Sequence, residues 1–321
     1  MELPAILKVE IENKCATFKQ ADLISAAQTI SERYRKESGH GKRLLTRDIE
    51  AVSYAVVRMP ATYGAVSSAL AYTFECFREP VASILDIGAG TGTASWAIKE
   101  QLSNPVTFTC LERENAMIAL GSELMTADPQ LSKAKWIRHD LAVSPVEQHA
   151  DIVIASYALN ELDDKKREEV LHNLWACADK LLVIVEPGTP VGFNQLRQTR
   201  KMLIDLGGHV VAPCAHGKEC QLAEDDWCHF TCRVSRSRLH KLMKGGDAPY
   251  EDEKYTFLAM AKVPGQPVPA RILRHPLKEA GRITLKLCRE DGIVEKAVTK
   301  KHGDLFKKAR KANSGDFFPE C

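Results

Sequence analysis

The amino-acid sequence predicts a doubly wound, Rossmann-like α/β fold in which helices cover a seven-stranded sheet. With 321 residues, 45% of them hydrophobic, the chain is long enough for one large domain with smaller appendages. From Ser83 onward, short β-rich runs alternate with helical segments. These runs are apolar on both faces, as expected for strands of a parallel sheet that helices cover. The predicted strands are residues 83–88, 106–112, 135–140, 151–156, 180–186, 208–212 and 255–263.

Residues 1–80 are predicted to form an N-terminal helical region. Ala-rich periodic segments cover residues 23–34 and 46–57, and Thr46 followed by Glu50 suggests a helix start. Pro60 must end or kink this helix before another runs on to Phe77, because proline lacks the N–H that a helix interior needs.

The central domain is predicted over residues 81–263, with an insertion at 213–254 between the sixth and seventh strands. A Pro/Gly-rich linker at 263–269 leads into a C-terminal extension, residues 264–321. Within the extension, a strand at 282–288, a turn at Asp291-Gly292 and the run IVEKAVTK predict a β-hairpin.

Charge is unevenly distributed along the chain. Residues 81–210 carry 12 basic and 17 acidic side chains, whereas residues 262–321 carry 14 basic and 7 acidic ones. A basic extension on an acidic core suggests a polyanionic partner, with RNA as the leading candidate. A solvated basic surface without a partner explains the same charge pattern.

The chain has no apolar stretch of the length that a signal peptide or a transmembrane helix needs, so we expect no membrane partner. Its N-terminus has no presequence character, which leads us to expect the bacterial cytoplasm. A monomer is favoured. In such a reducing compartment, clustered cysteines bind metal more often than they form disulfides.

The segment LDIGAGTGTASWA places a glycine-rich turn between the first strand and the first helix. Glycines at positions 88, 90 and 92 let the backbone approach a ligand closely. A dinucleotide site would need the spacing G-x-G-x-x-G, and Thr93-Ala94-Ser95 after Gly92 breaks that spacing. The pattern therefore disfavours NAD, although a glycine-rich turn of some other doubly wound fold stays open.

Acidic residues accompany this turn at the ends of the first three strands. Glu112 ends the second strand, where a carboxylate accepts hydrogen bonds from ribose hydroxyls, and Asp140 ends the third. This arrangement resembles the class I S-adenosylmethionine-dependent methyltransferases. The resemblance implies that Glu112 binds the ribose and Asp140 the adenine of the cofactor. The residues implied around the methionine part are Asp86, Gly88, Gly90 and Gly92.

The methyl acceptor is harder to predict. The segment SYALNELDD after the fourth strand lacks the Asn/Asp-Pro-Pro-aromatic motif of base amino-group methyltransferases. Tyr157, Asn160 and Glu161 are candidates to line an acceptor site, or they mark a helix start with Asn160 as its cap. The pair Pro213-Cys214 resembles that of pyrimidine C5 enzymes, but it follows the sixth strand instead of the fourth.

The insertion contains a dense cysteine cluster. It has no C-x2-C pair, which weakens both a paired zinc knuckle and a redox pair. The wide spacing still permits zinc and suits an iron–sulfur cluster held by four thiolates, and unliganded thiols are the remaining alternative. The cluster reads Cys214-x5-Cys220-x7-Cys228-x3-Cys232, with His216 and His229 interspersed.

Five segments of the chain form a recognisable set. They are APCAHGKEC, WCHF, YAVVRMPATYGAV (54–66), RHPLKEAGRITLKLC (274–288) and LFKKARKANSGD. Together they resemble the methyltransferase-like proteins associated with the small ribosomal subunit in mitochondria, and their bacterial relatives. The resemblance covers nearly the whole chain, and the cysteine spacing is its most specific part. It implies a four-iron, four-sulfur cluster and a role in assembling the small subunit on its rRNA.

The same resemblance implies the cluster ligands Cys214, Cys220, Cys228 and the remote Cys288. Cys288 ends a predicted strand of the extension and is favoured as the fourth ligand, with Cys232 as its competitor. We interpret the other cysteines as ordinary thiols. They are Cys15, Cys76, Cys110, Cys177 and Cys321.

Basic residues follow the cysteine cluster directly and are candidates to contact rRNA phosphates. The leading hypothesis is a cofactor-binding, cluster-bearing assembly factor of the small subunit. The alternative is an active rRNA methyltransferase, and a weaker one is a small-molecule or protein methyltransferase with a structural zinc. The candidate RNA-binding residues are Arg233, Arg236, Arg238, Lys241 and Lys244.

Overall fold

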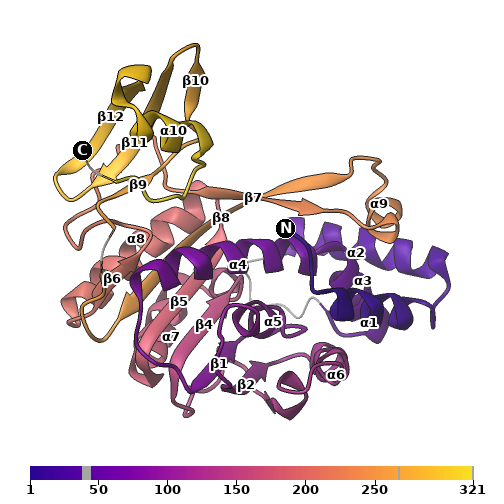
Figure 1. Ribbon diagram of the computed structural model, residues 1–321. Helices are drawn as coiled ribbons and strands as arrows, with labels where there is room; N and C mark the ends of the chain where they lie inside the picture. The colour runs from indigo at the N-terminus through magenta and orange to yellow at the C-terminus, as the bar shows by residue number, and fades with distance from the viewer. Residues whose placement is uncertain (38–44, 267, 320–321) are drawn as a thin grey trace. The chain divides into compact units, whose positions relative to one another are not determined.

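The computed structural model describes residues 1–37, 45–266 and 268–319 (Figure 1). The chain divides into two compact units. The first unit comprises Met1–Leu70, Pro80–Glu186 and Cys232–Glu253, and the second comprises Ala71–Glu79, Pro187–Thr231 and Lys254–Cys321. The predicted insertion at 213–254 thus contributes residues to both units.

The N-terminal region is helical, as predicted. Its helices are α1 (Ala5–Cys15), α2 (Gln20–Glu37), α3 (Asp48–Val57) and α4 (Met59–Cys76). Helix α1 precedes the predicted helical segments, and its buried side chains Leu7, Ile11 and Cys15 recur every four residues along one face. Pro60 lies in the first turn of α4, where a missing N–H breaks no helical hydrogen bond.

The first unit contains a five-stranded parallel sheet in the order β3-β2-β1-β4-β5. The order reverses at β1, so the turns that follow β1, β2 and β4 meet at one edge, where ligands bind in such sheets. The strands are β1 (Ser83–Ile87), β2 (Thr107–Glu112), β3 (Lys135–Arg138), β4 (Ala150–Ser156) and β5 (Ala178–Pro187). The helices that follow β1, β2 and β4 are α5 (Thr93–Lys99), α6 (Asn115–Met125) and α7 (Asp164–Cys177).

The remaining strands of the predicted sheet are β6 (His209–Ala212) and β8 (Tyr250–Ala261), which pair in antiparallel fashion. Helix α8 (Pro190–Asp205) precedes β6. The predicted α/β fold class of the class I methyltransferases is confirmed.

Two elements inside the insertion were not predicted. Strand β7 (Phe230–Ser235) pairs with β8, and α9 (Arg238–Lys244) follows it. Strand β8 also begins five residues earlier than predicted. The prediction missed its first residues, YEDEK, because they are largely polar, and they alternate between exposed and half-buried positions. In the first unit, α9 packs with α2 and α3 (Figure 1).

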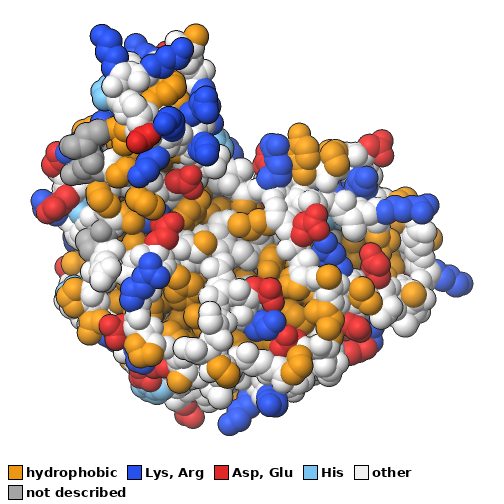
Figure 2. All heavy atoms as spheres, viewed as in Figure 1, with side chains coloured by type: hydrophobic (Ala, Val, Ile, Leu, Met, Phe, Trp, Pro, Cys, Tyr) orange, Lys and Arg blue, Asp and Glu red, His pale blue; other side chains and the backbone are white. Residues whose placement is uncertain are grey.

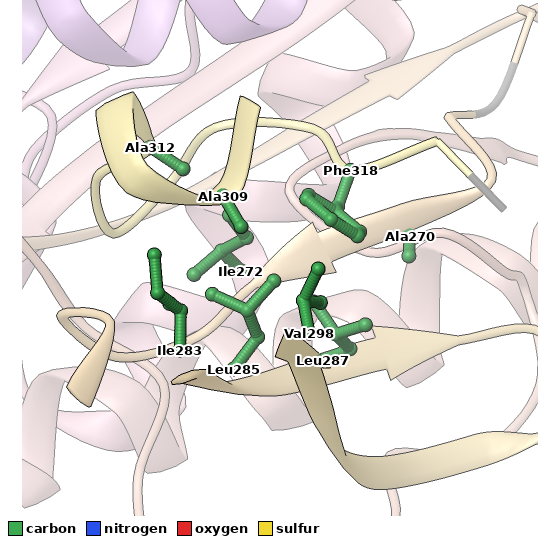
Figure 3. Packing of buried hydrophobic residues seen from close by; sticks show 9 residues of the cluster. All are labelled: Ala270, Ile272, Ile283, Leu285, Leu287, Val298, Ala309, Ala312 and Phe318. Atoms are coloured by element: carbon green, nitrogen blue, oxygen red, sulfur yellow. The ribbon is translucent and has the colours of Figure 1, made fainter. Parts of the chain in front are cut away.

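The C-terminal extension forms a second sheet in the order β10-β11-β12, with β9 paired to β11. The predicted hairpin is confirmed, since β11 and β12 run antiparallel around the turn at Asp291-Gly292. Ile283, Leu285 and Phe318 belong to the buried core between this sheet and helix α10 (Figure 3). The elements are β9 (Ala270–Ile272), β10 (Leu277–Glu279), β11 (Arg282–Arg289), β12 (Gly292–Thr299) and α10 (Asp304–Lys311).

Within the described residues, no helix is both long enough and apolar enough to cross a bilayer.

Candidate functional site

A cavity of about 120 Å³ lies at the carboxyl ends of β1, β2, β3 and β4 in the first unit. Four turns that are distant in the sequence contribute to it, because parallel strands end at the same edge of the sheet. Among the predicted cofactor residues, those that line it are Gly88, Gly90, Glu112 and Asp140.

A side chain would be strained at two positions of the glycine-rich turn. Gly88 has φ +60°, and a Cβ there would lie 2.6 Å from the Cβ of Ala158. Gly92 has φ +79°, and a Cβ there would lie 2.3 Å from the terminal methyl of Met125. Gly88 therefore brings the backbone to the cavity wall, whereas Gly92 lies outside the lining and serves close packing against α6.

Asp86 does not line the cavity, although the sequence placed it beside the cofactor. Its carboxylate is fully buried and accepts hydrogen bonds from the backbone N–H of Ser95, at 3.0 Å, and from the Ser95 hydroxyl, at 2.7 Å. Burial raises the pKa of Asp86 to about 7. The residue ties β1 to helix α5, and this direction of the side chain cannot be deduced from its place before the first glycine.

Glu112 is held by three backbone N–H groups at the cavity wall. Its Oε2 accepts from Gly90 at 2.8 Å, and its Oε1 accepts from Arg113 at 2.7 Å and Glu114 at 2.8 Å. Burial raises the pKa of the Glu112 carboxyl, and the three backbone donors oppose that shift. The carboxylate therefore has a fixed position where β2 ends.

Arg113, which the sequence did not single out, lies among the acidic side chains of this cavity. Its guanidinium lies 3.2 Å from Glu114, 4.0 Å from Asp140 and 3.8 Å from Glu161. Asp140 also accepts a hydrogen bond from the backbone N–H of Ala142 at 2.9 Å. The acidic wall is thus partly neutralised by one cation.

The three candidate acceptor residues separate in the structure. Tyr157 and Glu161 line the cavity, and Asn160 does not. Tyr157 has φ +55°, and its hydroxyl donates to Glu253 at 3.0 Å. Burial raises the pKa of Glu161 to about 7, against the opposing charge of Arg113.

The alternative interpretation of Asn160 as a helix cap is wrong. The cap of α7 is Asp163, whose side chain accepts from the backbone N–H of Lys166 at 2.9 Å. Asn160 instead lies in a single 3₁₀ turn, Leu159–Glu161, before that helix.

A second cavity, of about 50 Å³, lies in the second unit and brings four cysteines together. Burial and the neighbouring thiols raise the pKa of Cys228 well above its ordinary range, and the same causes raise that of Cys288 to about 12. Much of the remaining lining is apolar and includes Phe193, Leu196 and Leu258. The four cysteines are Cys214, Cys220, Cys228 and Cys288.

The competing ligand Cys232 does not line this cavity. It belongs to the first unit, where its sulfur packs against Gly64 of α4. His216 lines the cavity, with Nε2 3.7 Å from the sulfur of Cys288, whereas His229 does not line it. The structure therefore groups the thiols as the family resemblance implied, and separates Cys232 from them.

No group of three His, Cys, Asp or Glu side chains in the described ranges is arranged to hold a single metal ion. A tetrahedral zinc ion, with Zn–S bonds of about 2.3 Å, needs sulfur atoms less than about 4 Å apart. The four thiols line one cavity, but no three of them form a group that could hold one metal ion in the described structure. The remaining described cysteines are buried thiols without disulfides, and Cys321 lies outside the described residues. They are Cys15, Cys76, Cys110 and Cys177.

Helix α8 contributes two arginines to the cysteine cavity that the sequence analysis missed. Arg197 donates to the carbonyl oxygen of Cys220 at 3.1 Å, and Arg200 lies one turn further along the same face. Phe193, Leu196 and Leu203 are buried on this face. An arginine within an apolar helical stripe was the signal that could have identified Arg200.

The candidate RNA-binding residues after the cysteines are largely occupied by acidic partners. Arg233 pairs with Asp252 at 2.8 Å, while Arg236 and Lys244 both pair with Glu251 at 2.7 Å. Arg238 and Lys241 form no ion pair with a described carboxylate. All five belong to the first unit, whereas the four clustered thiols belong to the second.

The family model described as mitochondrial small ribosomal subunit Rsm22 matches residues 48–319. The chain belongs to this family. The family resemblance drawn from the sequence is therefore confirmed. Two Rsm22-cox11 tandem proteins of Schizosaccharomyces pombe, both mitochondrial by name, are 25% identical to this Rsm22-family chain and cover 93% of it. The chain spans about half the length of these relatives, 46% of each.

Other similarities concern part of the Rsm22-family chain or its fold. A carboxy-S-adenosyl-L-methionine synthase of Helicobacter hepaticus is 25% identical over 35% of the chain and 46% of its own length. Among solved structures, the magnesium protoporphyrin IX methyltransferase of Synechocystis has a TM-score of 0.42 and 14% identity, covering 65% of this chain and 85% of its own. The plantazolicin methyltransferase BpumL has a TM-score of 0.43 and 14% identity, covering 79% and 99%.

The expectation of a bacterial cytoplasmic protein is wrong. The matching family is described as mitochondrial, and the two tandem relatives carry the same word in their names. The expectation rested on the composition of the first residues, which do not determine the family.

Proposed function

We propose that this Rsm22-family chain is an S-adenosylmethionine-binding, methyltransferase-like assembly factor that binds rRNA of the small ribosomal subunit and carries an iron–sulfur cluster. The proposed binding of S-adenosylmethionine rests on one observation, the cavity that is lined by Gly88, Gly90, Glu112 and Asp140. The family description supports the small subunit as partner.

The cofactor fits the residues present at this cavity. The fixed carboxylate of Glu112 would accept hydrogen bonds from the ribose hydroxyls, and Asp140 would bind the adenine amino group. The acidic lining favours a ligand with a positive sulfonium, and Gly88 leaves the backbone open to its methionine part. When bound, S-adenosylmethionine supplies an electrophilic methyl group.

Calorimetric titration with S-adenosylmethionine and with its demethylated product tests this site. We expect Glu112→Gln to weaken both ligands at least about tenfold, because removing the charge weakens the ribose hydrogen bonds. Glu168→Gln, an exposed acid on α7, is the matched control and should bind as the wild type does. A wild-type chain that binds neither ligand would contradict the proposed cofactor.

A four-iron, four-sulfur cluster fits the cysteine cavity better than zinc does. Four thiols line one small cavity, while no described group of side chains is arranged for a single ion. A cluster holds its thiolates further apart than one zinc ion does, since each sulfur binds a different iron. The bound cluster would link the insertion to the C-terminal strands, with one-electron transfer as its available chemistry.

Anaerobic purification followed by iron, sulfide and zinc analysis tests the cluster. We expect a brown protein with iron and sulfide in equal amounts. Cys288→Ser should lose the cluster, whereas Cys232→Ser should keep it, because Cys288 lines the cavity and Cys232 does not. Stoichiometric zinc without sulfide would contradict the proposal.

Exposed cations of the C-terminal extension support rRNA binding better than the basic residues after the cysteines do. They form no ion pair with a described carboxylate, whereas three of the five residues after the cysteines do. Lys and Arg side chains gather over this part of the chain in Figure 2. The exposed cations are Lys278, Arg282, Lys300, Lys301, Lys308, Arg310 and Lys311.

Binding of small-subunit rRNA fragments at several salt concentrations tests this surface. Each lost phosphate contact should reduce the slope of log K against log salt by about one. We expect the triple change of Lys300, Lys301 and Lys308 to Gln to reduce the slope by about two to three. The double change of Arg238 and Lys241 should reduce it less, and equal effects would contradict the assignment to the extension.

Active methyl transfer to rRNA is the second candidate function. It is favoured by Glu161, which lines the cavity with a pKa near 7, the range that suits a general base at neutral pH. Mass mapping of small-subunit rRNA with and without the protein tests this activity. A methyl group that disappears with Glu161→Gln supports the enzyme, whereas unchanged modification supports an assembly role alone.

A further inference from the structure

Arg200 carries a buried positive charge without an acidic partner among the described residues. The residue is 6% exposed, and no carboxylate of the described residues lies within ion-pair distance of it. Its Nη2 donates to the carbonyl oxygens of His216, at 2.8 Å, and Lys218, at 2.6 Å. Its Nε is buried and has no hydrogen-bond partner in the described part of the chain. A lone buried charge is costly, so such a site suits an anion.

The thiols beside Arg200 can supply this anion. Cys214 and Cys288 line the same cavity as Arg200. Four thiolates carry more negative charge than a cluster core neutralises, so a ligated cluster is an anion that a nearby guanidinium stabilises.

Arg200 also holds the backbone that presents two of the thiols. The carbonyls of His216 and Lys218 lie between Cys214 and Cys220, and Arg197 binds the carbonyl of Cys220 from the same helix face. Helix α8 is anchored by its buried apolar residues, so it offers these donors from a rigid element.

We propose that Arg200 is a positioning residue that fixes loop 214–220 for ligation and offsets the negative charge of the thiolate-bound cluster. This inference rests on the proposed cluster. Two variants separate its parts: Arg200→Gln removes the charge, and Arg200→Lys keeps the charge but cannot reproduce the planar donor fork. The matched control is Lys201→Gln, which removes an exposed cation from the same helix.

The first measurement follows the reconstituted cluster. We expect Arg200→Gln to lose its visible absorbance in air at least about tenfold faster than the wild type, as is typical when a supporting residue around a metal site is removed. Its reduction potential, measured by EPR-monitored titration, should fall, because the lost cation no longer stabilises the more negative reduced state. Arg200→Lys should keep a potential near that of the wild type. If Arg200→Gln and Lys201→Gln lose absorbance at the same rate and have the same reduction potential, the proposal that Arg200 offsets the charge of the cluster would be overturned.

The second measurement uses the cluster-free chain. Hydrogen exchange of the amides in loop 214–220 should be at least about tenfold faster in both Arg200 variants than in Lys201→Gln, because the loop loses its donors. Unchanged exchange would overturn the positioning role. A wild-type chain that takes up neither iron nor sulfide would overturn the proposed cluster instead, and the exchange result would still decide whether Arg200 holds the loop.

Discussion

Replacing Arg271 by methionine should destabilise the second unit by about 2–4 kcal/mol, because two buried carbonyl oxygens lose a charged donor. Arg271 is fully buried on β9. Its Nε donates to the carbonyl of Pro213 at 3.1 Å, and its Nη1 donates to Glu75 at 2.9 Å and to the carbonyl of Gly315 at 2.8 Å. One side chain thus joins the end of α4, the start of the cysteine loop and the C-terminal segment.

The magnitude follows from what the variant leaves behind. Two carbonyl oxygens lose a charged donor, at about 1–3 kcal/mol for each buried group left unpaired. Glu75 is 37% exposed, so water rehydrates it and its lost ion pair adds little. The methionine side chain refills part of the volume, which keeps the loss in the lower half of the roughly 2–6 kcal/mol expected for two such carbonyl groups.

Urea unfolding followed by far-UV circular dichroism gives the free energy, and hydrogen exchange of the β11 amides assigns the loss to the second unit. Arg310→Met, an exposed arginine on α10, is the control and should change stability by less than about 0.5 kcal/mol. A loss below about 1 kcal/mol in Arg271→Met would refute the reasoning, because it would mean that the stranded carbonyls find other donors.

Three further predictions concern single residues. Because burial raises the pKa of Asp86 from 3.8 to about 7, the wild type loses stability as pH rises through that interval. In urea unfolding, the free energy of unfolding of Asp86→Asn minus that of the wild type should therefore increase by about 1–2 kcal/mol from about pH 5.5 to pH 8. A difference that does not change with pH would contradict a raised pKa of Asp86. Gly92→Ala should cost more than Gly207→Ala in thermal unfolding. Both have φ near +80°, but only Gly92 faces Met125 at 2.3 Å. Leu285→Ala, in the core of the C-terminal sheet, should cost about 2–5 kcal/mol in the same measurement.

The parallel strands could be predicted because hydrophobic runs bounded by turns determine them. Strand β7 and the start of β8 escaped prediction, since YEDEK has the polarity of a loop and becomes a strand only through its pairing with β7. Helix α1 escaped prediction, because Leu7, Val9 and Ile11 alternate with charged residues as in a strand, although only Leu7 and Ile11 of these three are buried.

The candidate sites show the same division. The sequence predicted that Glu112 and Asp140 would meet the glycine turn, because strand ends converge in a parallel sheet. The direction of Asp86 depends on its hydrogen bonds to Ser95, which no motif records. The ion pair between Arg233 and Asp252 could be predicted only from the pairing of β7 with β8. From the sequence alone, the basic residues after the cysteines were therefore expected to be unpaired.

The fourth thiol of the cysteine cavity has a consequence for the order of events during synthesis. Cys288 lies on β11, beyond the other three thiols in the sequence, and it pairs across the sheet with Arg271 on β9. A nascent chain that has emerged only as far as Cys228 therefore has three sulfurs and no complete cavity. The fourth thiol becomes available only after the chain has been synthesised past β11, so the cluster that we propose would be fully ligated only after that point. Its ligation would in this way report that the first strands of the extension have been made.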